Sequence, residues 1–430
     1  MVTPSLSTIN RQSKIENQTG VALLTGGGDR PYVLGLVAAL RAKGLVLDVI
    51  GSDELDGAEL RSEPGVNFLN LRGDLRPDAS FTTKIFRVLR YYARLIRYAA
   101  TAKPKIFHIL WNNKFEAFDR TLLMLYYRLL RKSIVLTAHN VNASRRDGND
   151  TRLNRLTLGI QYRLADHVFV HTDRMKLELV EEFGVEAARV AVIPFGINNT
   201  VPNTRLTPSE ARLRLGIRDG ERTILFFGNI TPYKGLEYLV AAFQRLLAQG
   251  EDYRLIIAGG ADRCESYWRA VRETLREDVQ RERVILRAEF IPDAETEVYF
   301  KAADVLALPY RHIYQSGVLF LAHSFGLPVL AADVGSLKDE IVEGKTGFVF
   351  RSEDPVDLAR TIEKYFASDL YAALSRRRKE IRQFATERHS WDVVARMTLA
   401  VYAGLRGISS SECRGEAAYG VSGNQAPRGF

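Results

Sequence analysis

The segment VLALPYRHIYQSGVLFLAHSFGLPVLAADVGSLKDEI, residues 305–341, decides the fold of this chain. Its first apolar run, 305–308, is typical of a buried strand. Ser316 is a residue type that caps helices, and the residues 318–325 predict the helix body. A second apolar run, 329–332, predicts another buried strand. The alternation predicts parallel strands in an α/β sheet.

Two helix starts are therefore predicted at one edge of this sheet. The first lies at Gly317, and the glycine-containing turn 333–336 leads into a second helix at 337–342. In open α/β sheets this edge binds ligands, and the unpaired N–H groups of helix starts favour anions, phosphates above all. Ordinary crossover units with capping glycines are the alternative.

A second segment, TILFFGNITPYKGLEYLVAAF at 223–243, favours the anion site. It predicts a buried strand that runs into Gly228 and Asn229, then a loop that contains Lys234, then a helix. A glycine lets the backbone come close to a ligand, and a lysine supplies a point charge suited to a phosphate. A lone lysine near a helix start is usually only solvated, but a glycine turn at the carboxyl end of a strand is a place where ligands bind.

Length and composition limit the class of protein. The 430 residues exceed what one hydrophobic core usually covers, so two domains are expected. The hydrophobic fraction of 46% and the charged fraction of 26% are those of a globular protein. The net charge of +9 suits anionic substrates or a membrane surface and does not demand nucleic acid.

Cysteine usage and apolar runs indicate the compartment. The two cysteines, Cys264 and Cys413, exclude a disulfide framework and suggest neither a metal site nor a thiol catalyst, which fits a reducing compartment. The first 20 residues lack the apolar core of a signal peptide, and no apolar run reaches the length of about 18 residues that a transmembrane helix needs. We therefore expect a cytoplasmic protein.

Three glycines follow the first predicted strand, 21–25. They are Gly26, Gly27 and Gly28, and the order of strand, glycines and helix resembles a dinucleotide fingerprint. The spacing fails, however, because the third glycine of that fingerprint should fall on Pro31. We expect these glycines to serve a tight turn or another ligand rather than nicotinamide.

Residues 81–102, FTTKIFRVLRYYARLIRYAATA, predict a basic amphipathic helix. One face carries arginines and another carries apolar side chains. The arginines are Arg87, Arg90, Arg94 and Arg97, and the apolar residues are Ile85, Leu89, Tyr92, Ile96 and Ala99. Such a helix can rest on anionic lipid, and the alternative is a surface helix docked on its own sheet with its arginines in water.

A histidine follows another predicted strand. The run SIVLTA at 133–138 predicts a buried strand, and His139 stands at its carboxyl end, where a site residue or a structural histidine would both fit. The polar segment NNTVPNTRLTP at 198–208 is the linker candidate, and the alternation of strands and helices restarts after it. Two doubly wound domains of similar size follow, with a cleft between the carboxyl edges of their sheets.

Several segments together resemble a known family. FFGNITPYKGLEYLVAAF, VIPFGIN, TAHNV and QSGVLFLAHSFGLPVLAADVGSLKDEIVEGKTGFVF resemble the retaining, nucleotide-sugar-dependent glycosyltransferases of family 4, over roughly residues 21–402. The wording is that of the subset with QSGV in place of the usual glutamate motif. The resemblance implies the GT-B fold, which is α/β with two Rossmann-like doubly wound domains facing a central cleft. It also implies sugar transfer from a nucleotide-sugar donor to a glycan or lipid-linked acceptor, as in surface polysaccharide or glycolipid synthesis.

The chain divides accordingly into six expected parts. These are a flexible lead-in at 1–19, an N-terminal acceptor domain at 20–197, a linker at 198–210, a C-terminal donor domain at 211–390, a terminal helix at 391–406 that packs back toward the N-terminal domain, and a disordered tail at 407–430. Peripheral contact with an anionic membrane is expected only if the basic helix serves it.

The resemblance also implies roles for particular residues. His139 would approach the donor sugar near the reacting carbon, and Lys234 would contact the donor diphosphate, so both are catalytic candidates. The donor-binding candidates are Gly228, Asn229, Lys234, Phe290, Ile291, Gln315, Ser316 and Gly317, and Gly27 and Gly28 are expected on the acceptor or phosphate side. No metal and no cofactor besides the nucleotide-sugar is expected.

The chain departs from the family pattern at three positions. Asn229 stands where the family usually has an arginine, so one positive charge is missing from the expected phosphate clamp. Ile313 and Leu321 stand at the places of two glutamates, the second of which normally holds the ribose. Gln315 can substitute for the first by neutral hydrogen bonding.

Three hypotheses therefore stay open. The first is an active retaining glycosyltransferase. The second is another enzyme, either a sugar-nucleotide epimerase of the same shape or a nicotinamide oxidoreductase. The third is a degenerate homologue that binds nucleotide without catalysis, which the missing glutamates favour and the retained glycines and Lys234 oppose.

Overall fold

The computed structural model of this chain describes most of its length. The described residues are 20–74, 80–113, 115–146, 149–197, 201–218, 220–250, 252–261 and 264–406. The predicted lead-in at 1–19, the predicted tail at 407–430 and the first three residues of the predicted linker lie outside them.

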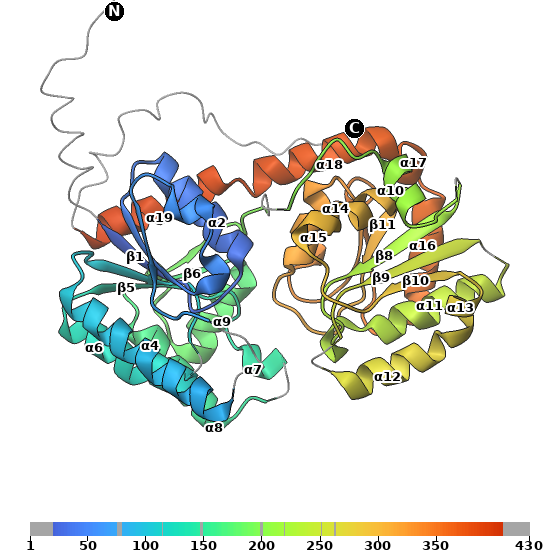
Figure 1. Cartoon of the computed structure of the whole chain (residues 1–430). Coiled ribbons are helices and arrows are strands. Elements are labelled where there is room, and N and C mark those ends of the chain that lie inside the picture. The colour runs from blue at the N-terminus through green and yellow to red at the C-terminus, as the bar shows by residue number, and fades with distance from the viewer. Residues whose placement is uncertain are drawn as a thin grey trace, which may run out of the picture.

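The N-terminal domain is built on a parallel sheet of seven strands in the order β3-β2-β1-β4-β5-β6-β7 (Figure 1). The strands are β1 (Val21–Leu24), β2 (Leu47–Gly51), β3 (Val66–Asn70), β4 (Ile106–Ile109), β5 (Ser133–Thr137), β6 (His167–Val170) and β7 (Val190–Val192). The central strands β1 and β4 are buried along their whole length because helices cover both faces of the sheet, and they are apolar except at His108.

Strand order decides which helices share a face. The chain steps one way along the sheet from β1 to β3 and the other way from β3 to β7, and parallel crossovers are right-handed. Helices α2 (Arg30–Ala42) and α3 (Ala58–Arg61) therefore cover one face. The opposite face is covered by α4 (Phe81–Thr101), α5 (Glu116–Phe118) with the π-helical turn Asp119–Leu123 and α6 (Met124–Leu129), then α8 (Arg152–Leu164) and α9 (Asp173–Phe183), with the short α7 (Ala143–Arg146) before α8.

The C-terminal domain repeats the plan with six parallel strands in the order β10-β9-β8-β11-β12-β13. The strands are β8 (Arg222–Phe227), β9 (Tyr253–Ala258), β10 (Val284–Arg287), β11 (Val305–Leu308), β12 (Val329–Ala332) and β13 (Gly347–Phe350). The helices are α10 (Pro208–Arg214), α11 (Leu236–Ala248), α12 (Glu265–Thr274), α13 (Arg276–Gln280), α14 (Asp293–Ala302), α15 (Gly317–Ser324), α16 (Pro355–Phe366), α17 (Asp369–Ala372) and α18 (Leu374–Arg388).

The last helix, α19 (Trp391–Leu405), returns to the N-terminal domain and packs on α2 (Figure 1). The Trp391 ring fills the space beside Gly35 and Gly196, where an added Cβ would lie 2.2 and 2.3 Å from it. Its indole N–H donates to the carbonyl of Ile197 at 2.8 Å. The two segments that join the domains are thus bonded to each other.

The second helix predicted from the opening segment, at 337–342, is wrong. The chain forms only a 3-10 turn, Lys338–Glu340. The physical reason lies just before it, where the Ser336 N–H and hydroxyl both donate to the carbonyl of Tyr314. Ser336 therefore fixes the neighbouring loop rather than starting a helix, and only α15 presents a helix start here.

Helix α4 docks on a face that the sequence pattern predicted only in part. Its buried residues are Tyr91, Tyr92, Leu95 and Ala99. Three members of the predicted apolar line, Ile85, Leu89 and Ile96, are exposed. Periodicity predicts an apolar line but not which residues beside it meet the sheet. None of the helices in the described parts of the chain has the length and apolarity needed to cross a membrane.

Candidate functional site

The carboxyl end of β8 forms one wall of the candidate site. Gly228 follows the strand with φ +97°, which favours glycine, and an added Cβ would lie 2.7 Å from Lys234 Nζ. Lys234 ends the 3-10 turn Pro232–Lys234, immediately before α11. The glycine therefore leaves room for the ammonium group beside the backbone.

Lys234 is a buried cation without an acidic partner. Its side chain is only 6% exposed, and its ammonium lies 5.7 Å from the centroid of the Tyr310 ring. No carboxylate of the described residues lies within ion-pair distance of it. Burial lowers the pKa of Lys234 to about 8, so the lysine is still mostly charged at neutral pH. An unpaired buried charge is costly, and a bound anion would offset that cost.

The segment Gln315–Gly317 leads from β11, the strand that pairs with β8, into α15. Ser316 occupies the capping position but makes no cap hydrogen bond, and its hydroxyl donates to the Tyr310 hydroxyl at 3.4 Å. The Gln315 side-chain oxygen is buried and has no hydrogen-bond partner among the described residues. An added Cβ on Gly317 would meet nothing within 4 Å, so the helix start is open to a ligand.

The opposite wall is aromatic and centres on His139. Its ring stacks on Trp111 with centroids 4.0 Å apart and meets the edge of Tyr32 at 4.6 Å. The sequence pattern did not identify these two rings. Burial and the nearby His171 hold the pKa of His139 well below its ordinary value, so the imidazole is neutral.

A chain of hydrogen bonds fixes the tautomer of His139. His171 Nδ1 lies 3.2 Å from the carbonyl of Ile193, so it carries the proton and donates. His171 Nε2 is then an acceptor, and His139 Nδ1 donates to it at 3.0 Å. The remaining nitrogen, His139 Nε2, is a buried acceptor with no partner among the described residues. It can accept a hydrogen bond from a ligand hydroxyl.

The glycine turn after β1 supports this wall. An added Cβ on Gly28 would lie 2.0 Å from the Trp111 ring, and one on Gly27 would lie 2.3 Å from the Arg72 guanidinium. Arg72 in turn donates to the carbonyl of Gly26. These glycines let Trp111 and Arg72 pack against the turn, and the His139 ring stacks on Trp111.

Two cavities lie between the domains. The larger, of about 750 Å³, is lined by residues of both domains, among them Arg145, Arg174, Glu178, Ile313 and Tyr314. The smaller, of about 290 Å³, is lined among others by Asp29, Tyr32, Phe195, Gly317 and Leu321. The smaller cavity brings the α15 start of one wall to the aromatic cluster of the other. It is therefore the better candidate for a reaction centre.

Of the predicted site residues, Gly317 alone lines either cavity, and it lines the smaller one. His139, Lys234, Gly228, Gln315 and Ser316 are not among the lining residues of either cavity. Phe290 is 77% exposed and Ile291 is buried, and neither lines a cavity. Asn229 is exposed next to Gly228. The positions of the two missing glutamates do face the cavities, with Ile313 on the larger and Leu321 on the smaller. These positions thus present apolar side chains to the cleft.

A hydrogen bond joins the two domains beside the larger cavity, which both of its residues line. The Tyr314 hydroxyl donates to Glu178 at 2.8 Å.

No group of three His, Cys, Asp or Glu side chains arranged to hold a metal ion occurs within the described ranges. Sequence reasoning also missed His171, although it follows β6 as His139 follows β5, and that parallel was the available signal.

Comparison with known proteins gives two consecutive family matches. Residues 26–200 match the model of Glycosyltransferase Family 4, and residues 221–368 match the model of Glycosyl transferases group 1. The first match ends near the last strand of the N-terminal sheet, and the second begins at β8.

Several curated relatives are named D-inositol 3-phosphate glycosyltransferase. The D-inositol 3-phosphate glycosyltransferase of Corynebacterium aurimucosum is 27% identical over 67% of this chain and 70% of that protein. The protein of the same name from Nocardia farcinica is 32% identical over 53% of this chain and 52% of its own length. The chain therefore aligns with about half to two thirds of these relatives.

Solved structures share the whole fold. Sucrose-phosphate synthase from Thermosynechococcus elongatus matches with a TM-score of 0.72 and 21% identity, over 91% of this chain and 100% of that one. Anabaena HepE, solved in complex with UDP and glucose, matches with a TM-score of 0.69 and 17% identity, over 90% and 100%. The predicted GT-B architecture of two Rossmann-like domains is confirmed.

Proposed function

The chain belongs to glycosyltransferase family 4, and from this premise we propose that it is a retaining enzyme that moves a sugar from a nucleotide-sugar donor to a glycan or lipid-linked acceptor in surface polysaccharide or glycolipid synthesis. The observation that carries the proposal is Lys234, a buried cation at the carboxyl edge of a parallel sheet that has no acidic partner among the described residues. The diphosphate of a donor supplies the negative charge that this position lacks.

The donor spans both walls in this proposal. Its diphosphate lies beside Lys234 and the start of α15, and its sugar extends from the smaller cavity, which Tyr32 and Gly317 line, toward the neighbouring ring of His139. His139 Nε2 then accepts a hydrogen bond from a sugar hydroxyl. Structural neighbours support this donor class, since HepE has been solved with UDP and with UDP-glucose. Gln315 offers a further buried acceptor without a partner among the described residues.

The chemistry needs stabilisation of a leaving diphosphate. The bond between the anomeric carbon and the phosphate oxygen breaks, and the acceptor oxygen bonds that carbon on the same face. The acceptor proton passes to the leaving phosphate. Lys234 and the N–H groups of α15 stabilise the charge that develops, an effect worth about 3–4 kcal/mol for one well-placed donor.

The residues around the smaller cavity fit this route. Asp29 is the one carboxylate that lines it among the described residues, and this carboxylate already accepts the N–H of Tyr32 as the cap of α2. Neutral His139 accepts a hydrogen bond rather than donating a proton. The proposal therefore assigns no carboxylate nucleophile, and it needs no metal ion and no cofactor besides the donor.

The test measures nucleoside diphosphate release from UDP-, GDP- and ADP-sugars by the native protein, by Lys234→Ala and by Lys345→Ala, which changes an exposed lysine of the same domain. We expect release from one donor class, loss of release with Lys234→Ala and no change with Lys345→Ala. Absence of both turnover and binding for every donor would overturn the proposal.

A degenerate nucleotide binder is the second candidate. The apolar side chains of Ile313 and Leu321 favour it, because they give the ribose no hydrogen-bond acceptor. Binding of one donor class without turnover, with and without extracts that contain glycan acceptors, would support this second candidate. A location in the cytoplasm, peripheral at the inner face of the membrane, belongs to the first proposal.

A further inference from the structure

Helix α4 leaves apolar side chains in water. Phe81, Phe86 and Leu89 are 77%, 65% and 60% exposed, and Ile85 and Ile96 are also exposed. Helices that dock by one face normally turn charged or polar residues outward. The outer face of α4 is instead apolar and basic.

The two neighbouring helical segments continue this surface. Leu122, Leu125 and Leu129 recur at helical spacing along the π-helical turn and α6, and all three are exposed. Leu153 and Leu156, one turn apart on α8, are exposed as well. A single exposed leucine is common on protein surfaces, but three neighbouring helical segments that each expose several apolar side chains indicate a binding surface.

The topology places these three helical segments side by side. They cover the same face of the seven-stranded sheet, and Figure 1 shows α4, α6 and α8 together on the outside of the N-terminal domain. The Tyr126 hydroxyl of α6 donates to the carbonyl of Ile96 on α4 at 3.2 Å. Each helix begins at the carboxyl edge of the sheet, so Phe81, Leu122 and Leu153 lie toward the cleft.

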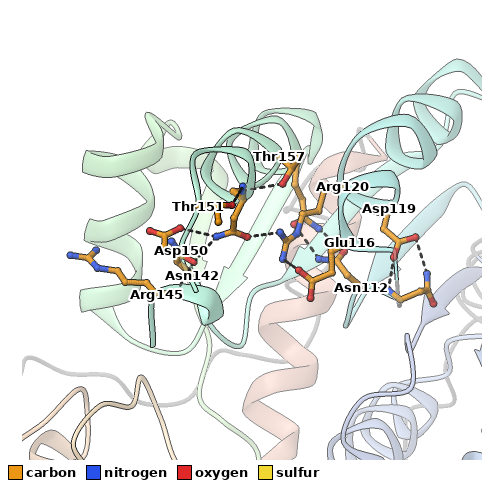
Figure 2. A network of polar contacts seen from close by, with 12 residues as sticks. Asn112, Glu116, Asp119, Arg120, Asn142, Arg145, Asp150, Thr151 and Thr157 are labelled. Atoms are coloured by element: carbon orange, nitrogen blue, oxygen red, sulfur yellow. Dashed lines mark hydrogen bonds and ion pairs between the residues drawn. The ribbon is translucent and has the colours of Figure 1, made fainter. Parts of the chain in front are cut away.

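A polar network joins the π-helical turn before α6 to α8 (Figure 2). Arg120 donates to Asn154 at 2.8 Å and pairs with Glu116, and Asn154 donates to Asn142 at 3.0 Å. Arg120 and Asn142 are buried, so this network lies beneath the surface. The network therefore fixes the start of α8 relative to the π-helical turn before α6.

Positive charge is concentrated on the same segment. Residues 80–166 contain 17 Lys and Arg against 5 Asp and Glu, an excess larger than the net charge of the whole chain, +9. Five of the arginines are exposed and have no acidic partner among the described residues, namely Arg90, Arg97, Arg131, Arg152 and Arg163.

The acidic residues of this segment do not cancel that charge. Glu116, Asp150 and Asp166 each pair with an arginine of the segment, and buried Asp119 accepts from Tyr92. The described part of the segment thus offers a surface that combines exposed apolar side chains with free arginines. Such a surface matches the interface of a bilayer with anionic headgroups.

We propose that the outer face of α4, α6 and α8 docks this protein on a bilayer that contains anionic lipids. The exposed apolar side chains enter the headgroup region, and the arginines pair with lipid phosphates. The docking itself rests on these side chains alone. One consequence rests on the proposed function, namely that the cleft edge next to Phe81 and Leu153 lies at the bilayer surface and receives a lipid-linked acceptor.

A second copy of the chain is the competing occupant. Two such faces brought together would oppose unpaired arginines of like charge, which disfavours a dimer through this surface. A bilayer offers negative charge to every arginine at once. Charge complementarity therefore selects the membrane.

The test is sedimentation of the full chain with vesicles of phosphatidylcholine alone and of phosphatidylcholine mixed with phosphatidylglycerol. We expect binding to the mixed vesicles that weakens as salt rises. The double variant Arg90→Glu with Arg97→Glu should bind at least about tenfold more weakly, as should Leu122→Ser with Leu129→Ser.

Matched controls come from the C-terminal domain. Leu213, 80% exposed on α10, and the exposed Arg272 of α12 should tolerate Leu213→Ser and Arg272→Glu without loss of vesicle binding. All variants change exposed side chains, so their thermal unfolding should match that of the native chain.

Three results would overturn the proposal. They are no binding to either vesicle, equal losses in the control variants, and a stable dimer that the Leu122 and Leu129 changes disperse. Donor binding and turnover in solution are measured separately. Vesicle binding with neither donor binding nor donor turnover rejects the transferase and keeps the docking surface, and donor turnover without vesicle binding does the reverse.

Discussion

The two walls of the candidate site offer a ligand opposite things. The C-terminal wall presents charge and backbone through Lys234, Gly228 and the start of α15. The N-terminal wall presents stacked rings and one neutral acceptor, His139 Nε2. A ligand with an anionic end and a hydroxyl-rich end satisfies both. The contrast teaches that the two domains offer different chemistry to the cleft, a buried cation on one and neutral rings on the other.

The largest expected effect comes from removing the charge of the C-terminal wall. Lys234→Met should lower donor turnover about 10²–10³-fold, since one stabilising group in the transition state is lost. It should also raise the free energy of unfolding by about 1–3 kcal/mol, because the pKa of Lys234 lies near 8 rather than 10.5 and the charge is unpaired. Kinetics and urea unfolding measure the two changes. Lower stability together with lost activity would mean that Lys234 is structural.

The next effect tests the space beside that charge. Gly228→Ala should lower donor turnover about 10–100-fold, since the new Cβ would lie 2.7 Å from Lys234 Nζ and the φ of +97° is unfavourable for alanine. Gly216→Ala is the matched control, because it also has positive φ but no neighbour within 4 Å. Equal activity of the two variants would remove Gly228 from the site.

The pH dependence of the two walls should differ. Above pH 8 the free protein loses the Lys234 charge, so donor affinity should fall about tenfold per pH unit. In unfolding experiments the sign reverses, since the unfolded chain binds more protons between pH 8 and 10.5 and the contribution of Lys234 to stability rises with pH there. Calorimetric titration of donor binding measures the first trend. Lys234→Arg should abolish it, and an unchanged slope would assign the titration to another group.

The smallest effect tests the neutral wall. His139→Phe keeps a ring on Trp111 and removes the acceptor, so donor affinity should fall only about tenfold, the value of one hydrogen bond to a neutral acceptor. Because burial keeps the native imidazole neutral, the loss should be the same from pH 6 to pH 8. A loss that grows as pH falls would show that His139 acts as a cation.

The charged wall could be predicted from sequence because it is local. Gly228 and Lys234 stand six positions apart in one strand, turn and helix, and their residue types state their chemistry. The strands were equally clear, since buried parallel strands are short apolar runs. The prediction of a helix at 337–342 was wrong because Ser336 donates to the carbonyl of Tyr314, and sequence pattern does not show where that loop lies.

The aromatic wall could not be predicted because it is assembled from distant segments. Tyr32, Trp111 and His139 come from three separate segments of the N-terminal domain, and Trp391 joins them only because α19 crosses back to that domain. The apolar line of α4 failed for a related reason, since the residues that meet the sheet depend on how far the helix is rotated against it. Local patterns therefore predict charge and backbone better than ring packing.

The bond between Trp391 and Ile197 has a mechanical consequence. The chain leaves the N-terminal domain after Ile197 and re-enters it at Trp391, and the 2.8 Å hydrogen bond joins the two passages at one point. Because the two connections between the domains are bonded to each other at one place, we expect relative motion of the domains to be a rotation about this place rather than a sliding movement. The Tyr314–Glu178 hydrogen bond joins the same two domains beside the larger cavity. We therefore expect a wider opening of the cleft to break the Tyr314–Glu178 hydrogen bond and to keep the Trp391–Ile197 hydrogen bond.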